Sequence, residues 1–409
     1  MSRCLTTSAP RPGQSCGGSL GGGFANVLND SFRTSGELND SFEKPQSFSE
    51  ESGMTSKTAI HNVRVFDGLT VRERSTVVID GSVIGTDASG AQVVDGDGGI
   101  LIPGLIDAHI HLKSRETLEQ LTRWGVTTGL DMATWPPSRL AALRGTPGLS
   151  DIRSAGTPAI GPGGPHARMP GRADDAILRT TDQAESFVDT RIANGSDYLK
   201  IVLEAPGEGG PDEAAARAYV EAAHRRGKLV VAHAAALGAF RLAVDIGADV
   251  VTHVPLGAPL PAEVVARLVS AKTVAVPTLS MMETIAGNVG KPEAFAGASR
   301  SVAALHAAGV PILAGTDANT APGSPASVEH GRSLHHELEL LVQAGLSALD
   351  ALRAATSLPA QHFGLSDRGA ITPGLRADLV LVDGDPTTEI STTRNLVRIW
   401  CGGTAHSPA

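Results

Sequence analysis

Apolar residues in the middle of the chain come in short β-branched runs that alternate with Ala-rich stretches. Each run is bounded by Gly, Pro or polar residues, which predicts strands. We place eight strands, at 101–111, 126–132, 152–159, 198–203, 229–233, 250–253, 274–279 and 310–317. The stretches between them have helical apolar spacing, for example at 117–124, 211–226 and 236–246. Eight strand–helix units over about 250 residues have the length and order of an α/β fold, the (β/α)8 TIM barrel.

Strand-like patterns also flank this region on both sides. They occur at 59–66 and 75–81, and again at 378–383 and 396–401. We therefore expect a small β-sandwich domain built from both chain ends, 57–100 and 368–409, with the barrel at 101–367 inserted between its halves. Residues 1–56 are rich in Ser and Gly, and we predict a disordered tail there, because such a segment buries too little apolar surface to offset its ordering entropy.

Composition narrows the class of protein. The chain has 409 residues, 41% of them apolar, and a net charge of −9, which argues against nucleic acid or an anionic membrane as partner. No apolar run reaches the roughly 18 residues of a membrane helix. The three cysteines, Cys4, Cys16 and Cys401, do not form a disulfide framework, so we expect a cytoplasmic protein. Arg3 and Arg11 precede the first acidic residue, which leaves an organellar transit peptide as an alternative.

Two histidines stand one residue apart at the end of the first predicted barrel strand, in the run PGLIDAHIH at 103–111. Residues i and i+2 of a strand share a face, so His109 and His111 direct two imidazoles to one place, roughly 7 Å apart at the backbone. Such a pair suits a transition-metal ion. The alternative is two inward histidines that are satisfied by hydrogen bonds.

Further polar residues stand at or near the ends of other predicted strands. They are Lys200, His233, His253 and Asp317. Each is costly in a barrel interior unless it is paired or ligated. Each alone could be a satisfied core residue, but the strand ends of a barrel converge, and we therefore expect a joint site.

With these residues the chain resembles the metal-dependent amidohydrolase superfamily over roughly 57–401. The carriers are the run at 103–111, Lys200, His233, His253, the run GTD at 315–317 and the run GAITPGLRADLV at 369–380. The resemblance is to the imidazolonepropionase-like branch, which includes Xaa-Pro and Xaa-Arg dipeptidases and ochratoxin-type amide hydrolases.

The resemblance implies two divalent metal ions, with Zn²⁺ as the leading choice and Mn²⁺ or Co²⁺ as substitutes. His109, His111 and Asp317 would hold the first ion, and His233 and His253 the second. Lys200 would bridge them as a carbamate formed with CO₂. Burial supports this because it disfavours the ammonium and leaves a reactive neutral amine. The alternative for Lys200 is a snorkelling lysine or an ion pair with Asp317.

The expected reaction is hydrolysis of a C–N amide bond by a metal-bridging hydroxide, with Asp317 as the proton shuttle. In the Gly- and Pro-rich loop at 161–170, His166 could polarise the substrate carbonyl and Arg168 could bind a substrate carboxylate. The alternative for both is an ordinary surface loop. Tyr198 shares a strand face with Lys200 and is either a substrate-side donor or a core residue.

The expected substrate is a small molecule: a dipeptide, an N-acyl amino acid or an amide-linked toxin. A lactonase or a phosphotriesterase with the same site is the alternative, and a non-catalytic amidohydrolase-like scaffold is a remote one. We also expect a homo-oligomer, whose size the sequence does not fix.

Overall fold

The structure is a computed structural model that describes residues 57–169, 174–321, 324 and 326–409. The predicted tail at 1–56 lies outside the described residues. None of the described helices is long and apolar enough to cross a membrane.

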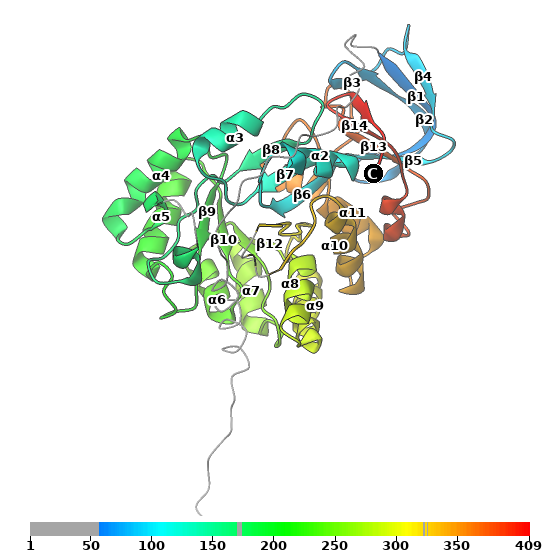
Figure 1. Ribbon diagram of the computed structural model, residues 1–409. Coiled ribbons are helices and arrows are strands. Elements are labelled where there is room, and N and C mark those ends of the chain that lie inside the picture. The colour runs from blue at the N-terminus through cyan, green and yellow to red at the C-terminus, as the bar shows by residue number, and fades with distance from the viewer. Residues whose placement is uncertain (1–56, 170–173, 322–323, 325) are drawn as a thin grey trace, which may run out of the picture.

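Strands from the two ends of the described chain form one mixed sheet of eight strands. Its strands are β1 (Thr58–Phe66), β2 (Val71–Asp80), β3 (Val83–Gly85), β4 (Gln92–Asp95), β5 (Ile100–Pro103), β13 (Leu379–Val382), β14 (Leu396–Cys401) and β15 (Thr404–His406). The early and late halves meet where β13 pairs antiparallel with β5, and β5 in turn pairs parallel with β1. In Figure 1 the blue and red strands gather at one end of the molecule. The prediction of a β unit from both chain ends is thus confirmed as one mixed sheet.

The middle of the chain contributes two sets of parallel strands. One set comprises β6 (Leu105–Ile110), β7 (Val126–Asp131) and β8 (Asp151–Ser154), and the other β9 (Leu199–Val202), β10 (Val230–His233), β11 (Val250–Thr252) and β12 (Val274–Val276). Single parallel bridges join the sets, Ala159 with Ile201, Ala275 with Ile312 and Ile110 with Ala318. These pairings link eight successive segments in a circuit. All residues of β6, β7 and β9 are buried, as in parallel sheets covered by helices.

Helices follow most of these strands and lie on the outside of the parallel strands (Figure 1). They are α2 (Arg115–Arg123), α3 (Pro137–Leu143), α4 (Ala184–Ala193), α5 (Glu213–Arg225), α6 (Leu237–Asp245), α7 (Ala262–Ala271), α8 (Leu279–Asn288), α9 (Phe295–Ala307), α10 (Arg332–Gln343), α11 (Ala348–Ala354) and α12 (Ser357–His362). Short 3-10 turns are η1 (Pro165–Arg168), η2 (Asp174–Ala176), η3 (Thr181–Gln183), η4 (Pro292–Ala294) and η5 (Ile390–Arg394). The alternation of parallel strands and helices confirms the α/β class.

The predicted strand at 101–111 is wrong as a single element, because the chain changes sheets within it. Gly104 lies between β5 and β6, and a Cβ atom there would stand 2.1 Å from Thr127 Oγ1. Only glycine, which has no Cβ atom, lets the chain between β5 and β6 pass so close to Thr127. The apolar run therefore joins the terminal sheet directly to the strand that carries the two histidines.

The eighth predicted strand, at 310–317, is not a regular strand. Its hydrogen bonds are divided among partners: Leu313 N donates to Ala275 O at 2.9 Å, and Ala314 N donates to Ala354 O, at the end of α11, at 2.8 Å. Because a helix terminus takes one of its donors, the segment forms isolated bridges in place of a ladder. It still delivers Asp317 to the end of the neighbouring strand β6.

Candidate metal centre

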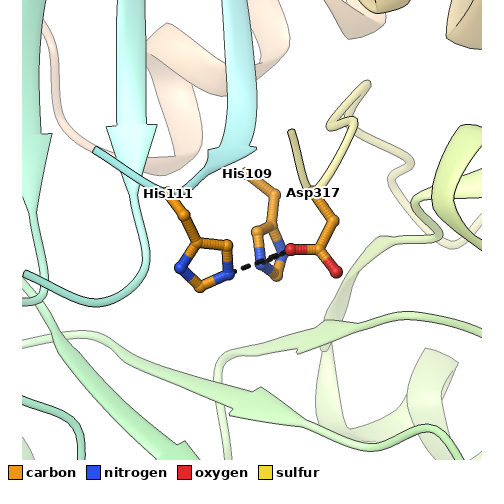
Figure 2. A group of neighbouring side chains, drawn as sticks. All are labelled: His109, His111 and Asp317. Carbon is orange, nitrogen blue, oxygen red and sulfur yellow. Dashed lines mark ion pairs between the residues drawn. The ribbon is translucent and has the colours of Figure 1, made fainter. Parts of the chain in front are cut away.

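Two imidazoles and one carboxylate meet at the end of β6. His109 Nε2 lies 3.2 Å and His111 Nε2 3.0 Å from the same oxygen, Asp317 Oδ1 (Figure 2). The potential ligand atoms of the three residues all lie within 4.8 Å of one another. Asp317 is held there by its own backbone, because its N–H donates to His109 O at 2.8 Å and its φ is 57°. A positive φ is unusual for a residue with a side chain and often accompanies functional sites.

The protonation states of this cluster suit a cation. Burial lowers the pKa of His109 to about 4, which leaves a neutral imidazole with a free lone pair at neutral pH. Burial alone would raise the pKa of Asp317, but the adjacent imidazoles of His109 and His111 outweigh it and hold that pKa well below its usual range. Neutral imidazole nitrogens and ionised carboxylates are common donors to zinc and related ions.

One buried atom of the cluster is also left without a partner. Among the described residues, His109 Nδ1 is inaccessible and makes no hydrogen bond. The nitrogen that approaches Asp317 is Nε2, so this unpaired Nδ1 is not one of the clustered donor atoms. The fit to a bound metal ion rests on the two imidazoles and one carboxylate, whose potential ligand atoms lie within 4.8 Å of one another.

Two more histidines extend the cluster. The ring of His253 lies with its centroid 5.1 Å from that of His109 and 4.4 Å from that of His233. Burial lowers the pKa values of His233 and His253 well below 6.5, so both rings are neutral. Asp317 also lies near His253, since its Oδ2 is 3.9 Å from His253 Nδ1.

Lys200 lies on β9 and is 4% exposed. Its Nζ donates to Thr252 Oγ1 at 2.9 Å, and none of the described carboxylates forms an ion pair with it. Burial lowers the pKa of Lys200 to about 7, although Asp317 and Asp131 oppose the shift. A substantial fraction of the amine is therefore neutral near pH 7. The ion pair with Asp317 that stood as the alternative is not formed.

The loop after β8 places His166 next to these histidines. The centroid of its ring lies 4.9 Å from that of His233, and its Nδ1 lies 3.3 Å from Glu204 Oε1. Glu204 had no sequence signal, since it follows β9 at an ordinary loop position. Arg168 uses Nη1 to hold its own loop, donating to Gly163 O at 2.7 Å. The end of the predicted loop, Pro170, lies outside the described residues.

The side chain of Tyr198 is buried and makes its contacts within the protein interior. Its hydroxyl donates to the backbone carbonyls of Asp131 at 2.9 Å and Arg153 at 3.1 Å. Its ring packs edge-on against Phe363, with centroids 5.0 Å apart. These contacts favour the core interpretation over a direct substrate contact.

Comparison with known proteins identifies the family. The sequence model of the amidohydrolase family matches residues 100–406. The chain belongs to the amidohydrolase family. This confirms the resemblance seen in the sequence, and this amidohydrolase carries a His–His–Asp cluster where a metal ion would bind.

Curated relatives and solved structures agree with this assignment. An uncharacterized protein of Mycobacterium tuberculosis (strain H37Rv) is 29% identical over 337 residues, covering 76% of this chain and 85% of the relative. An adenine deaminase of Methylobacterium sp. (strain 4-46) is 27% identical over 360 residues, covering 84% of this chain and 57% of that enzyme. Among solved structures, a Xaa-Pro dipeptidase with bound methionine has a TM-score of 0.73 and 24% identity, covering 86% of this chain and all of that one. An Aspergillus niger ochratoxinase has a TM-score of 0.71 and 19% identity, covering 86% and 96%. The structural likeness, together with the circuit of parallel pairings, implies a TIM-barrel-type fold.

A buried acid that sequence reasoning missed supports the metal cluster of this amidohydrolase. Asp107 Oδ1 accepts from His109 N at 3.1 Å and from Thr316 N at 3.0 Å, and its Oδ2 accepts from Thr316 Oγ1 at 2.7 Å. It thereby ties β6 to the segment that carries Asp317. Burial raises the pKa of Asp107 to about 7. Its spacing was a usable signal, because a residue two before His109 on a strand shares its face.

Proposed function

We propose that this amidohydrolase is a binuclear metal-dependent hydrolase that cleaves a C–N amide bond of a dipeptide, an N-acyl amino acid or an amide-linked toxin. The observation that carries the proposal is the meeting of His109, His111 and Asp317, with His253 and His233 in ring contact beside them. A closed (β/α)8 barrel with a β-sandwich domain beside it is part of the same proposal. So are the predicted domain boundaries, the homo-oligomer and the cytoplasmic location.

The residues divide into two groups of ligands. His109, His111 and Asp317 would hold one ion, and His233 and His253 a second. When bound, such ions would polarise the substrate carbonyl and lower the pKa of a water toward neutrality. Zn²⁺ matches these nitrogen and oxygen donors best.

Lys200 would join the two groups as a carbamate. Its neutral amine attacks CO₂ and loses one proton, which gives an anionic group with two oxygen donors. The lowered pKa and the absence of an ion pair among the described residues support this, because an ammonium locked to a carboxylate would not react. Thr252, which accepts a hydrogen bond from Nζ, would hold the Lys200 side chain in its buried position.

Asp317 has the geometry of a proton shuttle. Its Oδ1 lies close to Nε2 of both His109 and His111, while Oδ2 lies 3.9 Å from Nδ1 of His253. One oxygen can thus bind a cation while the other accepts a proton from water and gives it to the leaving amine. His166, half-buried beside His233, would orient the substrate carbonyl, with Glu204 fixing the direction of its ring. Arg168 would bind a substrate carboxylate with the guanidinium nitrogens that do not hold Gly163.

The similar proteins support hydrolysis of a C–N bond in general terms. The solved structures include a dipeptidase and an ochratoxinase, and the curated relatives include adenine deaminases. Their identities of 19–27% leave the substrate of this chain open to the assay below.

The decisive experiment compares His109→Ala with His224→Ala. His224 is an exposed histidine of α5 that pairs with Asp249 at 2.9 Å and lies outside the proposed ligand set. Metal analysis and a panel of dipeptides, N-acyl amino acids, lactones and phosphotriesters would be run with Zn²⁺. We expect His109→Ala to lose metal and activity and His224→Ala to keep both. Full metal content and activity in His109→Ala would disprove the site, and turnover of lactones or phosphotriesters alone would replace the amide substrate.

A second variant tests the bridge. Lys200→Ala should lose activity and regain part of it when bicarbonate and a short carboxylic acid are added, since these can occupy the position of the carbamate. Full activity without any addition would exclude the bridge.

A further inference from the structure

A threonine hydroxyl contacts His253 at the ring nitrogen Nδ1, which also lies 3.9 Å from Asp317 Oδ2. His253 follows β11 with a φ of 75°, and its Nδ1 lies 2.8 Å from Thr278 Oγ1. A histidine that binds a cation through one ring nitrogen carries its proton on the other, and that proton needs an acceptor. Thr278 Oγ1 is such an acceptor, which leaves Nε2 of His253 with the free lone pair.

Thr278 itself has an unfavourable backbone conformation. Its φ of 51° and ψ of 50° are left-handed, a conformation that is unfavourable for a residue with a side chain. Glycine would adopt it without this cost. The hydroxyl contact with His253 is the property of threonine that glycine lacks. Strained residues of this kind persist only where the surrounding structure holds them.

Thr278 occupies the capping position of α8 but does not cap it. Its side chain makes no capping hydrogen bond to the helix. A carboxylate from α10 does so in its place: Glu337 Oε1 accepts from Leu279 N at 2.8 Å, and Oε2 accepts from Ser280 N at 2.7 Å and from Ser280 Oγ at 2.9 Å. Glu337 is fully buried, and none of the described basic groups forms an ion pair with it. Its negative charge is stabilised by the helix N-terminus.

We propose that Glu337 is a positioning residue for His253, acting through Thr278. By binding the first two N–H groups of α8, it replaces the threonine as cap and holds Thr278 in the left-handed conformation. The freed hydroxyl then fixes the proton of His253 on Nδ1 and directs Nε2 to the ion. This inference rests on the proposed function, because it takes His253 to be a ligand of the second ion.

The experiment follows the release of metal from the loaded protein to a chelator. Thr278→Val removes the hydroxyl and keeps the β-branched shape, so the backbone strain is unchanged. Thr278→Ser restores the hydroxyl. Glu337→Gln presents an amide N–H₂ where two donors need an acceptor, and Ser280→Ala removes only one of the three contacts.

Ser301→Ala is the matched control, because this buried hydroxyl accepts from Leu260 N at 2.9 Å and contacts none of the proposed ligands. Measurements at pH 8 keep Glu337 ionised, since burial raises its pKa to about 7.

We expect Thr278→Val and Glu337→Gln each to lower the affinity for one of the two ions by roughly 10–100-fold. This is the usual effect of removing a hydrogen-bond partner of a metal ligand. Ser280→Ala should have a smaller effect in the same direction, while Thr278→Ser and Ser301→Ala should release metal as the unmodified protein does. In the Co²⁺-loaded protein, the absorption spectrum should change in Thr278→Val and be restored in Thr278→Ser. The double variant Thr278→Val/Glu337→Gln should release metal no faster than Thr278→Val alone, because the effects of two residues that act through one contact do not add.

A purely structural role for Glu337 would lower the melting temperature and leave metal release and the Co²⁺ spectrum unchanged, and this result would overturn the inference. Additive effects in the double variant would overturn it too, since Glu337 would then act independently of Thr278. His253→Ala separates the two proposals. If His253→Ala leaves both ions in place, the binuclear function fails. If it loses an ion while Thr278→Val and Glu337→Gln match the unmodified protein, only the present inference fails.

Discussion

Gly315 lies directly behind the metal cluster, and we predict that Gly315→Ala will damage it. A Cβ atom at this position would stand 2.5 Å from Val276 Cγ1, 2.9 Å from His109 Cβ and 2.9 Å from His109 N. The valine methyl can rotate away, but the backbone nitrogen of His109 moves only with β6. Gly315 has no positive φ, so the effect of the added methyl group is steric alone.

The magnitude follows from these distances. Relieving a 2.9 Å contact to an ordinary separation requires about 0.5 Å of movement, and inserting a methyl group into a packed interior typically costs about 1–3 kcal/mol. Metal sites tolerate ligand displacements of only about 0.2 Å. The same movement would change the 3.2 Å spacing between His109 Nε2 and Asp317 Oδ1. We therefore expect ion affinity to fall by roughly 10–100-fold.

The assay measures thermal unfolding of the apo protein and the affinity for Zn²⁺ by competition with a chelator. Gly287→Ala is the control, because Gly287 lies in α8, has no positive φ, and its Cβ would meet nothing within 4 Å. There we expect no loss, and a gain of up to about 1 kcal/mol from helix propensity. Wild-type stability and affinity in Gly315→Ala would refute the steric argument.

Two further predictions concern stability. His335 is fully buried between Thr393 Oγ1 and Trp124 O, and burial lowers its pKa to about 4, below the unfolded value of 6.5. The unfolded chain therefore binds the proton first, so the free energy of unfolding should fall by about 3 kcal/mol as the pH drops from 6.5 to 4, and His335→Gln should flatten that pH dependence in urea titrations. An unchanged slope in His335→Gln would contradict this. Removal of metal with a chelator should lower the melting temperature, and readdition of Zn²⁺ should restore it. The loss of stability is about 2.7 kcal/mol if the free metal had been at 100 times its Kd. An unchanged melting temperature would contradict a metal that binds only the folded state.

The residues of the cluster could be predicted from the sequence because each stands at the end of an apolar run. His109, His111 and Asp317 are brought together as expected, with His253 and His233 in ring contact beside them. Strand alternation and the convergence of strand ends carry this information locally. The assignment of a second ion and of the carbamate stays a prediction.

What the sequence did not predict depends on contacts between distant segments. Helix α8 was missed, because its buried residues directly follow the apolar run of β12 and read as its continuation. Its start is defined by Glu337, more than fifty residues further along the chain, and no local pattern shows that contact. The break at Gly104 was missed for the same reason, because the crowding comes from Thr127 on the next strand.

The junction at Gly104 has a consequence for the order in which the protein can be assembled during its synthesis. β5 is anchored on one side by β13, which the ribosome adds only after all the parallel strands and their helices. At roughly 5–20 residues per second, that partner arrives on the order of tens of seconds later. Asp317 is also synthesised later than His109 and His111, the two histidines that it contacts. β5 therefore leaves the ribosome with one edge open, and so does β6, whose partners at Ala314 and Ala318 are also made late. The metal centre can mature only after the segment that carries Asp317 has been synthesised.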